Sequence, residues 1–394
     1  MDTVRIGVVG LGNMGTYHCN YLQTVDGARL AAMCDSDAKK LQAAAGKWPE
    51  AKTFTSWQEM IGSGEIDAVL VATPHYSHPE ITITSLERGL HVLCEKPAAV
   101  TIKEARRMAD AGAKHPNLKF GLNFQMRTNP VLKKLREVIR AGDLGEITRI
   151  TWIVTNWFRT WSYYASGGWR ATWSGEGGGV LLNQCPHNLD QLYWLTGLMP
   201  SRITAVAHIG KTHPIEVEDE VSAIMEYAGG ATGHFITTTG EAPGTDRLEI
   251  AGDRGKIVAE GGKLTFRMSR QSVREFRETD PQSFAVPECW DTEIPIKPAA
   301  ADAARLMAQN FVNAIVKDEP LIAPGADGVK GLEIGNAMLM AGITRKPVDL
   351  PIDGDAYEAF LKELTQKYGG RKTLGKSGGA SPGSEMSSSF GRRQ

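Results

Sequence analysis

Cysteine is scarce in this 394-residue chain, and its cysteines show none of the paired spacings of disulfide frameworks or zinc sites. The five are scattered and odd in number: Cys19, Cys34, Cys94, Cys185 and Cys289. Such a set argues against a small disulfide-stabilised domain and a Cys-x-x-Cys zinc site, and it is typical of a reducing compartment. We therefore expect a cytoplasmic protein.

Long apolar runs and an excess of one charge are also missing. No run of about 18 apolar residues occurs, so no membrane-spanning helix is expected. The first residues lack a basic region followed by an apolar stretch and a cleavage site, so we expect no signal peptide. Forty-four lysines and arginines oppose 45 aspartates and glutamates, a net charge of −1. This balance provides no general attraction to nucleic acid or to an anionic membrane.

The chain is long enough for two domains, because 394 residues exceed the usual limit of one hydrophobic core. Up to about residue 125, short apolar runs alternate with helix-like stretches, which predicts an α/β domain with a parallel sheet. The predicted strands are Val4–Val9, Ala28–Cys34, Ala68–Ala72, His91–Cys94 and Lys119–Leu122. The predicted helices between them are Met14–Val25, Pro79–Arg88 and Ile102–Ala113.

The pattern changes after residue 125, where long strand-like segments predict an α+β domain with a mostly antiparallel sheet over residues 126–365. Two glycine-containing joints, at residues 229–230 and 252–255, predict hairpin turns. The predicted strands are Glu146–Asn156, Arg202–Ile209, Glu218–Tyr227, Ala231–Thr239, Asp246–Ala251 and Lys256–Glu260. Helices are predicted near Pro130–Ala141, Ala300–Val316 and Gly328–Ala341. Residues 366–394 are poor in apolar side chains and are expected to form a disordered tail.

A GxGxxG element follows the first predicted strand and opens the first predicted helix. It consists of Gly10, Leu11, Gly12, Asn13, Met14 and Gly15. In this context the glycines allow a tight turn and close approach of a pyrophosphate to the helix N-terminus, which predicts a Rossmann-type domain. Asp35 ends the second strand, where a carboxylate bonds the adenosine ribose and repels a 2′-phosphate. The motif therefore predicts NAD as cofactor in preference to NADP.

Polar residues follow the third and fourth strands, at the sheet edge where ligands bind. Thr73, Pro74, His75 and His78 follow the third strand, and we expect all four at the cofactor; a solvated loop histidine is the alternative for either histidine. Glu95 and Lys96 follow the fourth strand, and we expect both beside the cofactor. Pro97 restricts Lys96 to extended backbone angles. A lysine there can bond a substrate oxygen or exchange a proton with it, although a surface lysine in a turn explains the local sequence equally well.

The second candidate stretch contains three consecutive glycines followed by Asn183 and His187. These two residues share one face if the segment is helical. Oxidation of a hydroxyl-bearing carbon requires a base near the oxygen, and histidine suits that role at neutral pH; a hydrogen-bonded core histidine is the alternative. No HExxH motif or cluster of metal ligands is present, so no bound metal is expected.

Six of the nine tryptophans lie between residues 152 and 194, together with further aromatic residues. Aromatic faces stack on sugar rings, while arginine and amide side chains bond hydroxyls. The expected substrate contacts are Lys96, Arg127, Arg159, Trp169, Arg170, Trp173, Asn183 and His187. Packing in the core or in a subunit interface is the alternative for about half of the aromatic residues.

These motifs together resemble the glucose–fructose oxidoreductase / inositol dehydrogenase (Gfo/Idh/MocA) family over nearly all of residues 3–350. The residues that carry the resemblance are the glycine element at 10–15, Ala72-Thr73-Pro74, Glu95-Lys96-Pro97, and the segment from Gly177 to His187. The resemblance implies a Rossmann domain, a second domain with a large open-faced sheet, and dimers or tetramers formed through that sheet. It also implies that Lys96 is the catalytic lysine and His187 the proton-transferring histidine.

Two positions depart from the pattern of that family. Asn183 stands where the family usually has aspartate, and His75 where it often has asparagine after Thr-Pro. Asparagine can orient a substrate or His187, but it cannot ionise and raise the basicity of the imidazole by charge. The resemblance therefore leaves proton handling to Lys96 and His187.

The sequence predicts an NAD-dependent oxidoreductase that acts on a hydroxyl-bearing carbon of a sugar, a sugar derivative or a cyclitol, as a homodimer or homotetramer. One alternative is an NAD-dependent glycoside hydrolase that oxidises a ring hydroxyl transiently and eliminates the aglycone. The other is a non-catalytic, NAD-binding regulatory protein. Net NADH formation distinguishes the dehydrogenase from the hydrolase.

Overall fold

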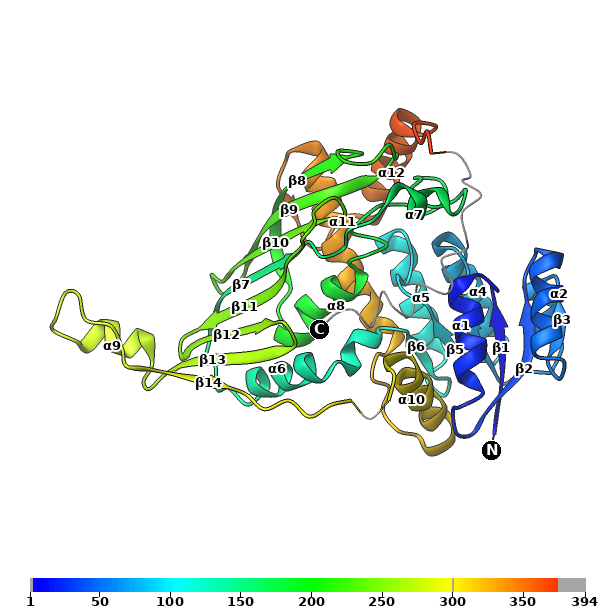
Figure 1. Ribbon diagram of the computed structural model, residues 1–394, viewed down its shortest axis with the longest axis horizontal. Coiled ribbons are helices and arrows are strands. Elements are labelled where there is room, and N and C mark those ends of the chain that lie inside the picture. Colours follow the sequence, from blue (N-terminus) through cyan, green and yellow to red (C-terminus); the bar gives the residue numbers. More distant parts are fainter. Residues whose placement is uncertain (1–2, 300, 375–394) are drawn as a thin grey trace.

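The computed structural model describes residues 3–299 and 301–374, and Figure 1 shows two sheets with helices between them. The first sheet has six parallel strands in the order β3-β2-β1-β4-β5-β6. Its strands are β1 (Val4–Val9), β2 (Ala28–Cys34), β3 (Lys52–Phe54), β4 (Ala68–Val71), β5 (His91–Cys94) and β6 (Phe120–Leu122). The predicted parallel sheet is confirmed, and the strand order places its topological switch point between β1 and β4. Dinucleotides bind at such a crevice.

Helices connect the strands of this sheet and begin at side-chain caps that the sequence supplies. Asp37, Ser56 and Thr101 each accept hydrogen bonds from backbone N–H groups of the helix that follows. The helices are α1 (Asn13–Leu22), α2 (Ala38–Lys47), α3 (Trp57–Gly62), α4 (His78–Glu87) and α5 (Ile102–Lys114). Helices α1 and α4 differ, because no side chain caps them; the N-cap of α1 is Gly12 and that of α4 is Ser77.

The second sheet has nine strands in the order β14-β13-β12-β11-β7-β10-β9-β8-β15. Only β7 and β10 pair in parallel, so the predicted mostly antiparallel sheet is confirmed. Both predicted hairpins are present, since β9 pairs with β10 and β11 pairs with β12. The strands are β7 (Ile147–Val154), β8 (Pro200–Ile209), β9 (Glu218–Tyr227), β10 (Thr232–Thr238), β11 (Asp246–Gly252), β12 (Gly255–Glu260), β13 (Lys263–Ser269), β14 (Cys289–Glu293) and β15 (Val348–Asp349).

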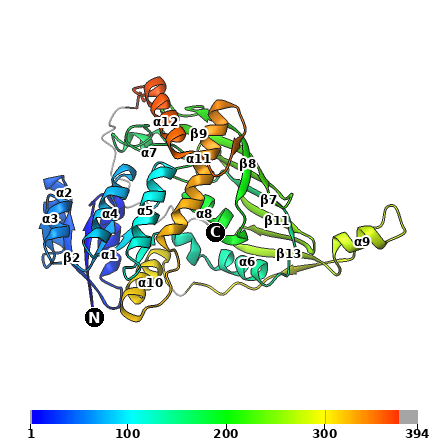
Figure 2. The same cartoon turned by 180° about the vertical axis from the view of Figure 1, so that it is seen from behind.

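One face of the second sheet carries helices and the other is open. The packed helices lie on the side that faces the first domain, as Figures 1 and 2 show. Residues of β9 alternate between buried and exposed from Val221 to Tyr227, as expected for a sheet with one solvated face. The helices of this half are α6 (Pro130–Arg140), α7 (Trp161–Ala165), α8 (Pro186–Thr196), α9 (Val273–Thr279), α10 (Ala303–Lys317), α11 (Gly328–Thr344) and α12 (Gly354–Tyr368).

The chain returns to the first domain in α10. Phe311 and Val312 of this helix share a hydrophobic cluster with residues of β1 and α1. The hydroxyl of Tyr17 in α1 also donates a hydrogen bond of 3.0 Å to the Asp302 carboxylate. Helix α10 therefore packs on α1 and β1 of the first domain, although it lies after residue 125, where the sequence predicts the domain boundary.

The beginning of the expected disordered tail is ordered. Helix α12 continues to Tyr368, and the Lys372 ammonium donates hydrogen bonds to the carbonyls of Gly167 and Arg170 at 3.0 and 2.7 Å. Helix α12 therefore extends into the segment that was expected to be disordered, and Lys372 beyond it contacts the body of the protein. Residues 375–394 lie outside the described residues. Among the helices that the structure describes, none is long and apolar enough to span a membrane.

Candidate active site

The glycine turn between β1 and α1 has the geometry that a dinucleotide requires. Gly10 has a φ of 92°, and a Cβ there would lie 2.7 Å from the Ala72 carbonyl oxygen. A Cβ on Gly15 would overlap the Gly10 carbonyl, so this position also requires glycine. At Gly12, by contrast, a Cβ would meet nothing within 4 Å. The open space at Gly12 and the absence of a side-chain cap fit a pyrophosphate at the start of α1, beside Asn13 and Met14.

Asp35 connects the end of β2 to this turn. Its carboxylate accepts hydrogen bonds from the backbone N–H groups of Leu11 and Asp37, at 2.7 and 2.8 Å. The side chain is partly exposed, and a carboxylate has about four acceptor sites, so acceptor capacity remains for ribose hydroxyls. Asp37 has a structural role, because its carboxylate caps α2 through the N–H groups of Lys39 and Lys40.

The two histidines after β4 are buried, so the alternative of solvated loop residues is wrong for both. The His78 ring nitrogens lie 2.8 and 2.9 Å from the carbonyl oxygens of Pro97 and Thr73, which joins the loops that follow β4 and β5. His75 Nδ1 lies 2.9 Å from the Glu176 carbonyl oxygen and connects the first domain to the second. Burial lowers the pKa of both histidines. Thr73 and Pro74 lie in the short segment that joins β4 to His75.

Glu95 points away from solvent and braces the segment that carries Lys96. One carboxylate oxygen lies 2.7 Å from His18 Nε2 of α1 and accepts a 2.7 Å hydrogen bond from the Asn123 amide. The other accepts a hydrogen bond from the Lys96 backbone N–H at 3.1 Å. Burial alone would raise the pKa of Glu95, but the contact with His18 and the positive charge of Lys96 lower it to about 2. Glu95 therefore places Lys96 relative to the helix that receives the cofactor.

Lys96 crosses from the first domain to the second. Its ammonium donates a 2.9 Å hydrogen bond to the backbone carbonyl of Asn183. Burial lowers the pKa of Lys96, while the carboxylates of Glu95 and Glu176 oppose that effect. Since an ammonium has three donors, the contact with Asn183 leaves further donors for a substrate oxygen.

Asn183 lies before α8 and not within it. The carbonyl of Gly179 accepts a 2.9 Å hydrogen bond from the Asn183 N–H, which forms a turn, and the helix starts only at Pro186. Proline is favoured at the first position of a helix, and it separates Asn183 from His187 here. The condition under which the two residues would share a helical face is therefore not met.

His187 lies in the first turn of α8 and is 4% exposed. Its ring makes an edge contact with Phe124, which follows β6, at a centroid distance of 6.2 Å. His187 thus belongs to the second domain and contacts the first, whereas Lys96 belongs to the first domain and contacts the second.

Three of the expected substrate contacts surround one loop of the second domain. The Arg170 guanidinium lies over the rings of Tyr163 and Trp169, 4.5 and 4.8 Å from their centroids. Trp169 also contacts the His75 ring at 5.9 Å. The Arg159 guanidinium lies over the same Tyr163 ring, 5.0 Å from its centroid. All of these side chains are partly exposed except His75.

Arg127 and Trp173 are placed in the interior. The Arg127 side chain is 1% exposed, and its guanidinium forms two hydrogen bonds with Asp190, of 2.9 and 2.6 Å, and one of 2.6 Å with Asp327. Trp173 is fully buried. Both positions favour a structural role over contact with a substrate.

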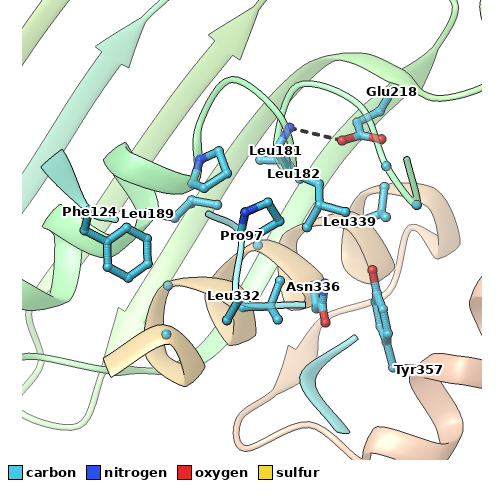
Figure 3. A pocket seen from close by; sticks show the side chains of 17 residues that line it. Pro97, Phe124, Leu181, Leu182, Leu189, Glu218, Leu332, Asn336, Leu339 and Tyr357 are labelled. Carbon is cyan, nitrogen blue, oxygen red and sulfur yellow. Dashed lines mark hydrogen bonds between the residues drawn. The ribbon is translucent and has the colours of Figure 1, made fainter. Parts of the chain in front are cut away.

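Behind the glycine segment 177–179 lies an apolar cavity of about 20 Å³, shown in Figure 3. Glu218 borders it and accepts hydrogen bonds from the backbone N–H groups of Gly179 and Leu181, at 2.8 and 3.1 Å. Burial raises the pKa of Glu218 to about 7. Because the lining is almost wholly apolar, we assign the cavity to the packing of this segment and not to a polyhydroxylated substrate.

Sequence reasoning gave no role to Glu176 or Glu218, and it counted Tyr163 only among the aromatic residues between 152 and 194. The only local signal for Glu176 was its position directly before the three glycines. Glu218 begins β9 and contacts the segment from a distant part of the chain. Within residues 3–299 and 301–374, no group of three or more histidine, cysteine or acidic side chains could hold a metal ion.

Comparison with known proteins identifies the family. A model described as "Oxidoreductase family, NAD-binding Rossmann fold" matches residues 4–124, and the GFO/IDH/MocA C-terminal domain matches residues 132–258. This chain belongs to the Gfo/Idh/MocA oxidoreductase family. Its first domain is an NAD-binding Rossmann domain, which confirms the predicted cofactor and fold class.

Several Gfo/Idh/MocA relatives align over much of the chain. The rhizopine catabolism protein MocA of Rhizobium meliloti is 33% identical over 239 residues, which cover 59% of this chain and 70% of the relative. The 1,5-anhydro-D-fructose reductase of Ensifer adhaerens is 27% identical over 349 residues, 88% of this chain and 98% of the relative. Among solved structures, the WlbA dehydrogenase of Bordetella pertussis, in complex with NADH and UDP-GlcNAcA, matches with a TM-score of 0.74 and 27% identity. That match covers 89% of this chain and all of the other.

Proposed function

We propose that this protein transfers hydride between NAD and a hydroxyl-bearing carbon of a sugar, a sugar derivative or a cyclitol, with Lys96 and His187 handling the proton. The observation that carries the proposal is the hydrogen bond from the Lys96 ammonium to the Asn183 carbonyl. It attaches the lysine from the NAD-binding domain to the segment of the second domain that leads into His187. Both groups thereby face the boundary between the two domains.

Each residue has a role that follows from its chemistry. NAD, when bound, accepts or returns the hydride. Lys96 donates a hydrogen bond to the substrate oxygen and stabilises negative charge on it as the hydroxyl proton leaves. His187 accepts that proton, since a neutral imidazole is a base near neutral pH. Asp35 bonds the adenosine ribose, and the N-terminus of α1 receives the pyrophosphate.

The second domain offers groups suited to a polyhydroxylated ring. Arg170, Tyr163 and Trp169 form a partly exposed cluster of an aromatic face and hydrogen-bond donors, and such clusters bind sugars through ring stacking and hydroxyl contacts. The relatives provide independent support. MocA is named for rhizopine catabolism, a second relative for the reduction of anhydrofructose, and WlbA was crystallised with a nucleotide sugar.

NADH formation against a panel of monosaccharides, anhydrosugars, glycosides and inositols tests the proposal. We expect net NADH with at least one free polyol or sugar, and loss of turnover in Lys96→Ala while NAD still binds. Release of an aglycone without net NADH would favour the glycoside hydrolase. Retained turnover in Lys96→Ala would remove the lysine from the mechanism.

The open face of the second sheet supports a homodimer or homotetramer. Val206, Ile224 and Ile236 are 40%, 49% and 37% exposed on three adjacent strands, β8 to β10. Clustered apolar side chains on an open sheet are typical of a subunit interface. Light scattering of the purified full chain measures the mass directly, and a monomer at micromolar concentration would contradict the assembly.

A further inference from the structure

We propose that Glu176 is a positioning residue whose carboxylate orients Asn183 and balances the positive charge of Lys96. The inference rests on the proposed function, because it concerns the same lysine and the same substrate oxygen. It explains how a site with asparagine at 183 still contains a negative charge. The carboxylate comes from the residue directly before the three glycines.

The carboxylate of Glu176 is buried, and each of its oxygens accepts a hydrogen bond. The side chain is 1% exposed. One oxygen accepts a hydrogen bond from the Asn183 side-chain amide, and the other accepts one of 2.6 Å from the backbone N–H of Ala171. In this arrangement both partners present an N–H group, so a carboxylate accepts from both, whereas an amide at 176 would direct an N–H group at a donor or require the Asn183 amide to turn over. The two contacts therefore favour an acceptor on each oxygen of Glu176.

The Asn183 amide is held from both ends. Its nitrogen donates to Glu176, and its oxygen lies 3.3 Å from the Tyr163 hydroxyl, which in turn accepts a 2.7 Å hydrogen bond from Arg170. The backbone carbonyl of the same residue accepts the hydrogen bond from Lys96. A change at Glu176 therefore reaches Lys96 through one intervening residue.

The charges around the lysine are of both signs. Burial raises the pKa of Glu176 above its ordinary value, although Arg170, the hydrogen bonds from Ala171 and Asn183, and Lys96 oppose that effect. The Glu176 carboxylate in turn raises the pKa of Lys96 against the effect of burial. The other charged or titratable groups whose electrostatic effects reach Lys96 or Glu176 are Glu95, Arg159, Arg170, His75, His78, Tyr164, Glu218 and Lys372.

The test is the pH profile of kcat/KM for NADH formation in Glu176→Gln. Removing the negative charge makes the ammonium of Lys96 harder to maintain, so the alkaline limb of the profile, where Lys96 loses its proton, should move to lower pH by about one unit. Glu216→Gln is the matched control. Glu216 is also a buried carboxylate that accepts from backbone N–H groups of this region, at Trp173 and Gly370, but it has no contact with Asn183. We expect the control to keep the wild-type profile.

Two further variants decide the question if Glu176→Gln is inactive or does not fold. Asn183→Asp keeps Glu176 and places a second carboxylate against it; the two carboxylates share a proton, so the pair keeps about one negative charge and the same limb should stay within about half a unit of wild type. The double variant Glu176→Gln/Asn183→Asp exchanges the amide and the carboxylate, and it should return the limb to within a few tenths of a unit of wild type.

The outcomes separate the two proposals. Normal turnover by the wild-type protein together with an unshifted limb in Glu176→Gln would overturn the role of Glu176 and leave the dehydrogenase intact. A double variant that fails to restore turnover lost in Glu176→Gln would also overturn it. Absence of NADH formation by the wild-type protein across the whole substrate panel would instead overturn the proposed function.

Discussion

Arg127 provides a sharp test of the difference between a substrate contact and a structural ion pair. Its guanidinium is 1% exposed, bonds Asp190 through two nitrogens, and also bonds Asp327 and the Ile322 carbonyl. In Arg127→Ala the Asp190 carboxylate, itself 1% exposed, would keep its burial and lose its cation. Removing one partner of a buried ion pair costs about 3–5 kcal/mol. We expect a loss of this size in the free energy of unfolding.

The measurement is denaturant unfolding followed by fluorescence, at several pH values. In the variant, burial without a cation should keep the pKa of Asp190 well above its unfolded value. The folded protein would then bind the proton more tightly than the unfolded chain, so the deficit should shrink as the pH falls. Arg267→Ala is the control, because Arg267 and Asp291 form the same two-nitrogen pair at 58% and 55% exposure, where little change is expected. A stable Arg127→Ala protein with a raised KM would refute the structural role.

Two other predictions follow from the site. Asp35→Ala should reduce the preference for NAD over NADP by about tenfold or more, because the 2′-phosphate no longer meets a carboxylate. Paired measurements of kcat/KM for the two cofactors check this, and an unchanged ratio would contradict the assignment. Glu218→Gln should remove one source of pH-dependent stability. Burial raises the pKa of Glu218 to about 7, so the folded protein holds a proton that the unfolded chain releases. This contribution to stability is present at low pH and is lost as the pH rises towards 7. Thermal unfolding of both proteins between pH 4.5 and 7.5 checks the sign, and identical slopes would contradict it.

The nucleotide half of the fold could be predicted because its signals are local. The glycine turn, the strand before it and Asp35 after the next strand lie within one short stretch, and each limits the backbone at its own position. Six of the nine strands of the second sheet were predicted for the same reason, since glycine joints and alternating apolar and polar residues are visible without tertiary contacts. Strands β13, β14 and β15 were not predicted.

The substrate side of the site depends on contacts that no local pattern contains. Asn183 and His187 suggest a helical pair by spacing alone, but Pro186 starts the helix between them. Arginine is a residue type that often bonds sugar hydroxyls, so the sequence suggested a substrate contact for Arg127. Only its partners Asp190 and Asp327, far along the chain, show that its side chain is buried in ion pairs. Glu176 gives no periodic signal, because its partners lie across a turn.

The ordered start of the carboxyl-terminal segment has a practical consequence. The Lys372 ammonium donates hydrogen bonds to two carbonyls of the loop that carries Trp169 and Arg170. A protein truncated at residue 365, where the sequence predicts the disordered tail to begin, would lack these two hydrogen bonds to the loop that is expected to bind the sugar. Purification tags therefore belong at the other end or beyond residue 374, and kinetic constants from shortened proteins would describe a loosened binding loop.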